Sequence, residues 1–276
     1  MARIQTFIFT LMLLGSSLAG CLDNSKSSEV IVNDSNTGFW TPSLNTTWQW
    51  QLTGEIDHSF DVVMYDIDLF TTNIEEIATL KSEGRVVICY FSAGSYEDFR
   101  SDSGQFPNET IGSTLDEWEG EWWLDYRDST VREIMKSRLD LAVEKGCDGV
   151  EPDNMDGFQN DNGLNLTATD QLNYNLFIAA ESHSRNLSVG LKNDLSQIPD
   201  LVDYYDWALN EECADYNECE EYKPFIDAGK AIFHVEYVNE ESEGQALAES
   251  LCLREDIVGL STLIKTWDLN PWVLVC

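Results

Sequence analysis

Acidic side chains stand where several apolar, strand-like segments of this sequence end. Asp153 lies near the end of one such segment, 149–154, and Glu211 ends another, 206–211. Glycoside hydrolysis commonly uses two carboxyl groups, one that protonates the leaving oxygen and one that attacks the sugar or activates water. We therefore predict that Asp153 and Glu211 are catalytic carboxyl groups.

Further polar residues lie on the same strand-like segments, and we predict that they contact the substrate. Lys192 could lower the pKa of a neighbouring carboxyl group, while Tyr65 or Tyr90 could hydrogen-bond a sugar. Glu151 has the same strand parity as Asp153 and would lie one layer deeper. The complete predicted set of substrate-binding residues is Tyr65, Asp66, Tyr90, Ser92, Glu151, Asn154, Asp156, Lys192, Glu236 and Tyr237.

Each of these assignments competes with a simpler structural role. Asp153 could cap a following helix, and Glu211 could be one more surface acid beside Glu212. Glu236 could be a structural partner of Lys192 or of a histidine. Most of the nine Trp residues are expected to pack in the core or at the rim, with one or two of them stacking on sugar.

The elements that must position these residues alternate between strands and helices. Eight strand-like segments are predicted at 62–68, 85–92, 121–126, 149–154, 188–193, 206–211, 231–237 and 260–266. Helical patterns lie at 74–83, 131–145, 167–185, 196–204, 220–228 and 243–252. Such alternation predicts an α/β fold, a single-domain (β/α)₈ TIM barrel over 39–276, whose chemistry lies at the C-terminal ends of its strands. The segment 48–52 is expected to cap that barrel or to line its mouth.

Several other classes of chemistry lack their sequence signature. No glycine-rich nucleotide-binding motif or GxSxG nucleophile elbow occurs, and no CxxC or Cys/His spacing suggests zinc. The stretch 156–169 does not fit an EF-hand, because Phe158 and Thr169 fall where calcium ligands belong. A looser metal site among Glu151, Asp153 and Asp156 stays open as a lesser alternative. We predict no cofactor and no metal.

The N-terminus predicts export. A basic residue, an apolar run too short to span a bilayer and a Leu-Ala-Gly-Cys ending at Cys21 resemble a lipoprotein signal. We therefore expect a signal peptide at 1–20, a flexible tether at 21–38 and a lipid on Cys21 that anchors the chain to the outer face of the membrane. Six other cysteines allow up to three disulfides; 213 with 219 and 252 with 276 are natural pairs, while Cys89 and Cys147 could also be buried free thiols.

The charge of the chain is strongly negative. Sixteen Lys and Arg against 50 Asp and Glu give −34. Nucleic acid and anionic lipid surfaces are poor partners for such a chain, because both bind positive patches. Most of this acidity is expected to be a solvated surface of the kind used in high salt, although a local role in attracting a cationic substrate stays open. We expect a monomer.

Five motifs in sequence order resemble glycoside hydrolase family 114, the endo-α-1,4-polygalactosaminidases of TIM-barrel type. They are Trp-Gln-Trp-Gln-Leu at 48–52, Tyr-Asp-Ile-Asp at 65–68, Cys-Tyr-Phe-Ser-Ala-Gly-Ser at 89–95, Asp-Gly-Val-Glu-Pro-Asp-Asn-Met-Asp at 148–156 and Asn-Glu-Glu-Cys at 210–213. The resemblance implies cleavage inside chains of α-1,4-linked galactosamine, with Asp153 as nucleophile and Glu211 as general acid/base. Glu212 stands where a Gln would be expected in that family.

Two alternatives to this function remain open from the sequence. The chain could be a non-catalytic polysaccharide-binding protein of the same fold, which would not need Asp153 and Glu211 beside one bond. It could also be a barrel glycosidase that acts on another α-linked galactose or galactosamine chain, because loops set the shape of the pocket.

Overall fold

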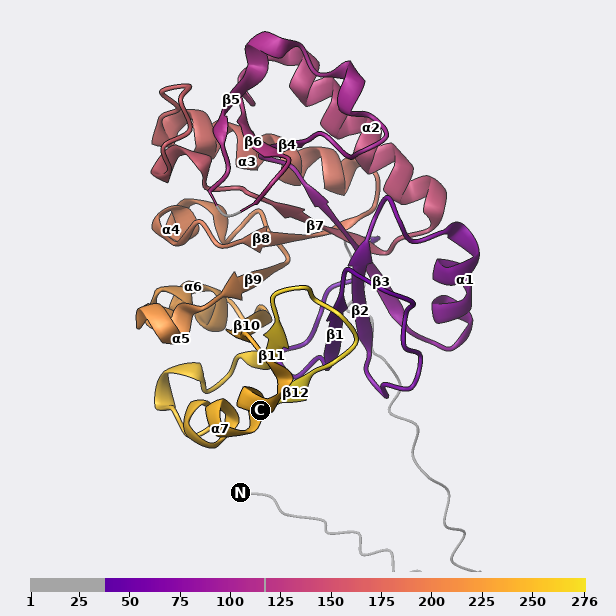
Figure 1. The fold of residues 1–276 in the computed structure, drawn as a ribbon, viewed down its shortest axis with the longest axis vertical. Coiled ribbons are helices and arrows are strands. Elements are labelled where there is room, and N and C mark those ends of the chain that lie inside the picture. The colour runs from indigo at the N-terminus through magenta and orange to yellow at the C-terminus, as the bar shows by residue number, and fades with distance from the viewer. Residues whose placement is uncertain (1–37, 117) are drawn as a thin grey trace, which may run out of the picture. The chain divides into compact units, whose positions relative to one another are not determined.

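The computed structural model describes residues 38–116 and 118–276 (Figure 1). The predicted signal peptide, the lipidated Cys21 and nearly all of the predicted tether lie outside these residues. Among the described residues, no helix is both long enough and apolar enough to cross a membrane.

The centre of the fold is a curved sheet in which, among the described residues, eight strands run parallel. Their order in space follows their order in sequence, as a βα-repeat predicts. The strands are β1 (Trp48–Gln51), β2 (Met64–Asp68), β3 (Val86–Ser92), β7 (Gly149–Asp153), β8 (Ser188–Lys192), β9 (Trp207–Glu211), β10 (Ile232–Val238) and β11 (Ser261–Thr266). A short strand, β12 (Leu274–Val275), pairs antiparallel with β11. The predicted α/β barrel class is confirmed.

One predicted barrel strand was wrong. Residues 121–124 form β6 (Glu121–Leu124), which pairs antiparallel with β4 (Ser95–Glu97) and β5 (Ile111–Thr114) in a separate sheet. The eighth parallel strand is β1, from the segment that was expected only to cap or line the barrel. All four residues of β1 are buried, whereas β6 leaves half of its residues partly exposed. The burial of its side chains explains why β1 belongs to the barrel.

Helices follow the strands and cover their outer face (Figure 1). The α-helices are α1 (Ile74–Ser82), α2 (Ser129–Lys145), α3 (Ala168–Ser184), α4 (Ile198–Leu201), α5 (Cys213–Tyr216), α6 (Lys223–Asp227) and α7 (Glu241–Leu251). Short 3₁₀ helices are η1 (Ser103–Gln105), η2 (Asn108–Thr110), η3 (Gly157–Gln159), η4 (Leu195–Gln197), η5 (Cys219–Tyr222) and η6 (Glu255–Ile257). The helices predicted at 196–204 and 220–228 are each divided into a 3₁₀ turn and a short α-helix.

Side-chain contacts join the first and last parallel strands. The Trp48 indole donates a hydrogen bond to the carbonyl of Ser261, over 2.9 Å, and the Ser261 hydroxyl donates to the carbonyl of Thr46. Beyond the strand ends, the Leu52 amide donates to the carbonyl of Leu269, over 3.0 Å. These bonds bring β1 beside β11. The C-terminal ends of the first and the last parallel strands therefore lie next to each other.

Disulfides link the six cysteines within the described residues. They are Cys89–Cys147, Cys213–Cys219 and Cys252–Cys276. The two natural pairings are confirmed, and the alternative of free thiols at Cys89 and Cys147 is wrong. Cys89–Cys147 spans 58 residues and ties strand β3 to the turn before β7, so it constrains the unfolded chain more than the other two bonds do.

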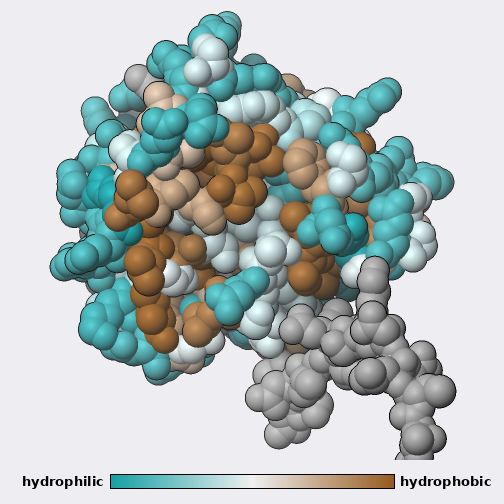
Figure 2. Space-filling model, turned by 90° about the horizontal axis from the view of Figure 1, so that it is seen from below, coloured by the Kyte–Doolittle hydropathy of each residue, from teal (hydrophilic) through white to brown (hydrophobic). Residues whose placement is uncertain are grey.

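The surface is not uniformly hydrophilic. On the face in Figure 2, apolar side chains gather in patches that hydrophilic side chains border. Exposed large apolar side chains of the molecule include Tyr216, Leu253 and Val258. Exposed apolar side chains are normal for folded proteins, and these patches do not by themselves mark a site.

Candidate active site

A cleft lies at the C-terminal ends of the parallel strands. Two adjoining cavities, of about 410 and 530 Å³, share walls that include Asn154, Asp156, Glu211, Tyr237 and Trp267. Seven of the twelve predicted site residues line the first cavity: Tyr90, Asp153, Asn154, Asp156, Lys192, Glu211 and Tyr237. The structure therefore brings both predicted catalytic carboxyl groups into one cleft.

The Lys192 side chain lies at the centre of this site. It ends strand β8 and is 1% exposed, and its ammonium nitrogen contacts carboxylate oxygens of Glu151, Asp153 and Glu211 at 2.9, 3.1 and 3.2 Å. The same nitrogen lies 4.8 Å from the centre of the Trp50 ring. These carboxylates raise the pKa of Lys192 well above its usual value although burial opposes this, so the side chain stays charged.

Asp153 accepts hydrogen bonds on both carboxylate oxygens. One oxygen contacts Lys192 and accepts from the Asn154 amide at 2.7 Å, and the other accepts from the Tyr90 hydroxyl at 2.9 Å. Burial and the nearby Asp153 raise the pKa of Tyr90 well above its ordinary value, which keeps this phenol a donor. Several donors of this kind stabilise an anion and fix its direction, as a nucleophilic carboxylate requires.

Glu211 is held by a different set of donors. Its Oε1 accepts from the Tyr237 hydroxyl at 2.5 Å, and its Oε2 contacts Lys192 and accepts from the Asn193 amide at 3.3 Å. Tyr237 stacks on Trp267, with 4.1 Å between ring centres. The Glu211 side chain is 26% exposed, compared with 18% for Asp153. Glu211 is therefore the more accessible carboxyl group of the two.

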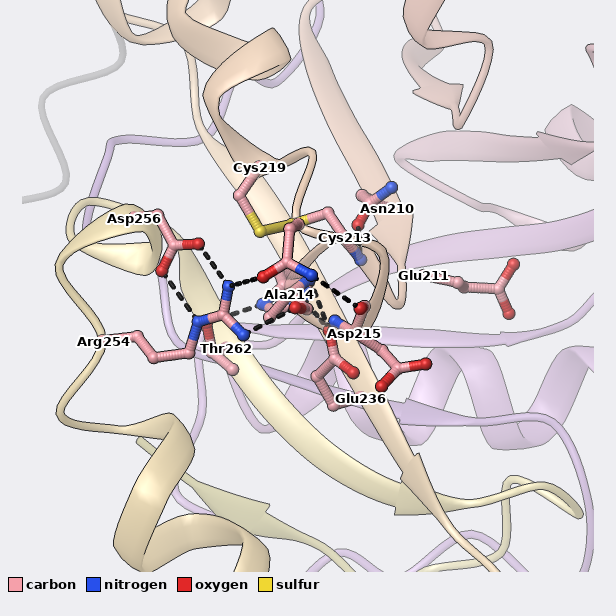
Figure 3. The surroundings of a disulfide bond; sticks show 12 residues. Asn210, Glu211, Cys213, Ala214, Asp215, Cys219, Glu236, Arg254, Asp256 and Thr262 are labelled. Atoms are coloured by element: carbon pink, nitrogen blue, oxygen red, sulfur yellow. Dashed lines mark hydrogen bonds and ion pairs between the residues drawn. A yellow bond between two sulfur atoms is a disulfide. The ribbon is translucent and has the colours of Figure 1, made fainter.

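A disulfide and a buried acid hold the segment after Glu211 in place (Figure 3). Cys213 and Cys219 close a short loop, and the Cys213 amide donates to the side chain of Asn210. Glu236 accepts from the Ala214 amide at 2.8 Å and contacts His234 at 2.9 Å. Predicted as a substrate contact, Glu236 instead holds this loop, because its parity on β10 is opposite to that of Tyr237 and turns it away from the cleft.

Four other predicted contacts also do not line the cleft. Tyr65 is fully buried and donates to the carbonyls of Asp57 and Phe60, because its strand parity points it out of the barrel. Ser92 is buried in bonds with Ser95 and Asn154. Asp66 and Glu151 are both fully buried inside the barrel, beneath Lys192.

Comparison with known proteins identifies the family. The profile of Glycoside-hydrolase family GH114 matches residues 31–276. This chain belongs to glycoside-hydrolase family GH114. It is similar to Aspergillus fumigatus Ega3, whose crystal structure is a complex with galactosamine, at 45% identity and a TM-score of 0.82; the match covers 86% of this chain and 97% of the Ega3 chain. The family resemblance predicted from the motifs is confirmed, and the chain is a glycoside hydrolase.

A solved structure of lower identity supports the fold, and a further relative matches part of the sequence. The glycoside hydrolase domain of Pseudomonas aeruginosa PelA is 13% identical, with a TM-score of 0.65, and the match covers 83% of this chain and 96% of that domain. Methanocaldococcus jannaschii MJ1477 is 28% identical over 151 residues, which are 50% of this chain and 43% of that protein. The chain therefore matches less than half of the length of this archaeal relative.

Sequence reasoning missed several residues that line the cleft of this GH114 enzyme. Phe99 and Arg100 belong to the segment between β4 and α2, where no helix or strand period marks them. Phe99, Trp118 and Trp267 are 59%, 50% and 44% exposed. Exposed rings at the edge of a cleft are suited to stacking on sugars, and Trp118 and Trp267 lie among the Trp residues for which this role was left open.

A second missed residue is Asp194, which forms an acidic pair with the predicted Asp156 in the adjoining cavity. Asp194 is fully buried, and one of its oxygens accepts from Asn175 while the other has no hydrogen-bond partner among the described residues. Burial and the nearby Asp156 raise the pKa of Asp194 to about 8. Burial and Asp153 raise the pKa of Asp156 to about 6. Both pKa values thus lie close to neutral pH. A cation bound nearby would favour the ionised form of each acid.

We expect Lys192→Met to destabilise this GH114 enzyme by about 3–5 kcal/mol, because it leaves buried carboxyl groups without their cation. The double variant Lys192→Met/Glu151→Gln should recover part of that loss. Urea unfolding at pH 7 measures both. Lys223→Met is the matched control, because Lys223 pairs with Asp227 on the surface and should contribute about 0–1 kcal/mol. Equal stability of Lys192→Met and the parent would contradict this account.

Proposed function

We propose that this chain cleaves α-1,4-linked galactosamine polymers within the chain, with Asp153 as nucleophile and Glu211 as general acid/base. The observation that carries the proposal is that one buried ammonium group, that of Lys192, contacts a carboxylate oxygen of each residue inside the cleft. The 45% identity to Ega3, which was crystallised with galactosamine, supports the sugar. The accessible Glu211 suits proton exchange with a leaving group and with water.

The charge of the cleft supports a cationic substrate. Among the described residues that line the two cavities, the cations are Lys192 and Arg100, and Arg100 is paired with Asp68 at 2.7 Å. The acids are Asp68, Glu97, Asp116, Glu121, Asp153, Asp156, Asp161, Asp194, Glu211, Glu212, Glu218 and Asp268. A deacetylated galactosamine carries an ammonium group, and such a wall attracts it. Asp156 and Asp194 should interact most strongly with this ammonium group, because a bound ammonium would stabilise both as anions.

The reaction follows from the two carboxyl environments. Protonated Glu211 gives its proton to the glycosidic oxygen as the Asp153 carboxylate forms a bond to the anomeric carbon and the carbon–oxygen bond breaks. A water molecule then attacks the same carbon and passes its proton to Glu211, and the bond to Asp153 breaks. Lys192 contacts both carboxyl groups, so its charge offsets their repulsion through both steps.

We expect Asp153→Asn and Glu211→Gln each to lower the release of reducing ends from partly deacetylated poly-α-1,4-galactosamine by about 10²-fold or more, as loss of an acid/base or nucleophile requires. Asp227→Asn is the matched control, because this acid lies on the surface in α6. The parent and control should release reducing ends at equal rates, at low and at high salt. A parent that binds the polymer tightly but releases nothing would favour the non-catalytic binding protein instead.

The spacing of the carboxyl groups predicts retention of configuration. The Asp153 and Glu211 oxygens that contact Lys192 can be no more than about 6.3 Å apart, the sum of their distances from its nitrogen. Retaining enzymes place their carboxyl groups about 5–5.5 Å apart and inverting enzymes about 6.5–9.5 Å apart. Proton NMR of the first product, recorded before mutarotation, should show the α-anomer. A β-anomer would exclude Asp153 as a nucleophile and assign it the activation of water.

We propose further that the enzyme is exported and held at the outer face of the membrane by a lipid on Cys21. The Leu-Ala-Gly-Cys sequence at 18–21 and the short apolar run before it support this anchor. Cells fed labelled palmitate should attach the label to the parent chain and not to Cys21→Ser, which should leave the membrane fraction. Equal labelling of the two chains would contradict the anchor and leave the proposed hydrolysis untouched.

A further inference from the structure

Two carboxyl groups are buried together below the floor of the cleft. Asp66, in the middle of β2, and Glu151, in β7, are both 0% exposed. Lys192 binds one oxygen of Glu151. Neither oxygen of Asp66 nor the other oxygen of Glu151 finds a donor among the described residues. The interaction left for them is a hydrogen bond between the two carboxyl groups, which requires a proton on one of them.

Among the residues that the structure describes, Asp66 has no ion pair of its own. The titratable groups that face it are Glu151 and Asp153 from β7, Lys192 from β8 and, beyond it on β3, Tyr90. Strand β1, on its other side, places Trp50 opposite Asp66 and has no titratable residue. The single ammonium group already contacts three carboxylates. An ionised Asp66 would therefore be a buried charge without a partner, which is costly.

We propose that Asp66 is a carboxylic acid that donates a hydrogen bond to Glu151 and so fixes Glu151 as the support of Lys192. In this arrangement Glu151 offers one oxygen to the Asp66 proton and the other to the ammonium group. The ammonium nitrogen is then held within 3.2 Å of Asp153 and Glu211. Asp66 is thus a positioning residue, which acts through Glu151 and Lys192 and does not touch the substrate.

The direction of the pKa shifts agrees with this geometry. Burial, and then the neighbouring Glu151, raise the pKa of Asp66 well above its usual 3.8. Burial also raises the pKa of Glu151, but Lys192 lies in direct contact with Glu151 and opposes the rise more strongly there. The proton therefore belongs on Asp66 and the negative charge on Glu151.

The first test compares Asp66→Asn with Asp66→Ala in the full-length chain. An Asn amide can still donate to Glu151, and an Ala cannot. We expect Asp66→Ala to lower kcat by about tenfold or more with little change in KM, as loss of a hydrogen bond to a charged group would. Asp66→Asn should restore most of that loss. This arm rests on the proposed hydrolysis of galactosamine polymers.

A second test needs no turnover. A group whose folded-state pKa is raised contributes stability that is complete below its unfolded pKa and is lost as the pH rises through the folded pKa. The parent should therefore lose stability relative to Asp66→Asn as the pH increases from about 4 to 9. The melting temperature of Asp66→Asn minus that of the parent should grow steadily over this range. Exposed Asp227→Asn, the control, should show no such growth.

Infrared spectra give a direct third readout. The parent at pH 7 should show carbonyl stretches of buried protonated carboxyl groups, to which Asp194 also contributes, and the difference spectrum between the parent and Asp66→Asn should show the loss of one such band. Three results would each overturn the proposal: an Asn variant as impaired in kcat as a folded Ala variant, a melting difference that is constant with pH, or no protonated-carboxyl band lost in Asp66→Asn. The melting and infrared results stand even if the chain proves to cleave another polymer, so the two proposals can fail separately.

Discussion

The buried ammonium group of Lys192 is the constraint on which the site depends. Taking a charged amine out of water costs several kcal/mol, and the contacts of Lys192 with three carboxylates and the Trp50 ring offset that cost. One positive charge cannot balance every surrounding acid, so some of them must hold protons. Asp153 and Glu211 differ in their other contacts, because Tyr90 donates to the first and Tyr237 to the more exposed second.

A second ionic network positions the wall of the cleft that lies between β3 and α2. Arg138 of α2 donates to the carbonyl of Ser92 at 2.7 Å and pairs with Asp102 at 2.8 Å. Arg100 pairs with Asp68, at the end of β2, and with Glu97, at 2.7 and 2.8 Å. Because these partners belong both to the barrel strands and to the segment inserted after β3, they fix the β4–β6 sheet, and with it Phe99 and Trp118, beside the cleft.

The sequence predicted the barrel class, seven of its eight parallel strands and the placement of Asp153 and Glu211 at the strand ends that border one cleft, because these depend on alternation and on strand ends. The prediction from sequence failed where strand pairing in the folded protein decides which sheet a segment joins. The segment 121–124 reads as an apolar strand, and only its partners β4 and β5 remove it from the barrel. Strand parity could have excluded Tyr65 and Glu236, which alternate with Asp66 and Tyr237 and so point to the outer face. Asp194 could not be found in this way, because it follows the strand in a left-handed conformation.

The acidic side chains in the cleft differ from those on the rest of the surface in how well water solvates them. On the surface, each acid can be solvated, and 50 acids need no common explanation. In the cleft, burial removes that solvation, and the pKa values of Asp156 and Glu121 rise to about 6 and about 7. A bound ammonium sugar would favour the ionised forms of these groups more than a neutral sugar would, so under the proposed function this wall would attract a cationic polymer.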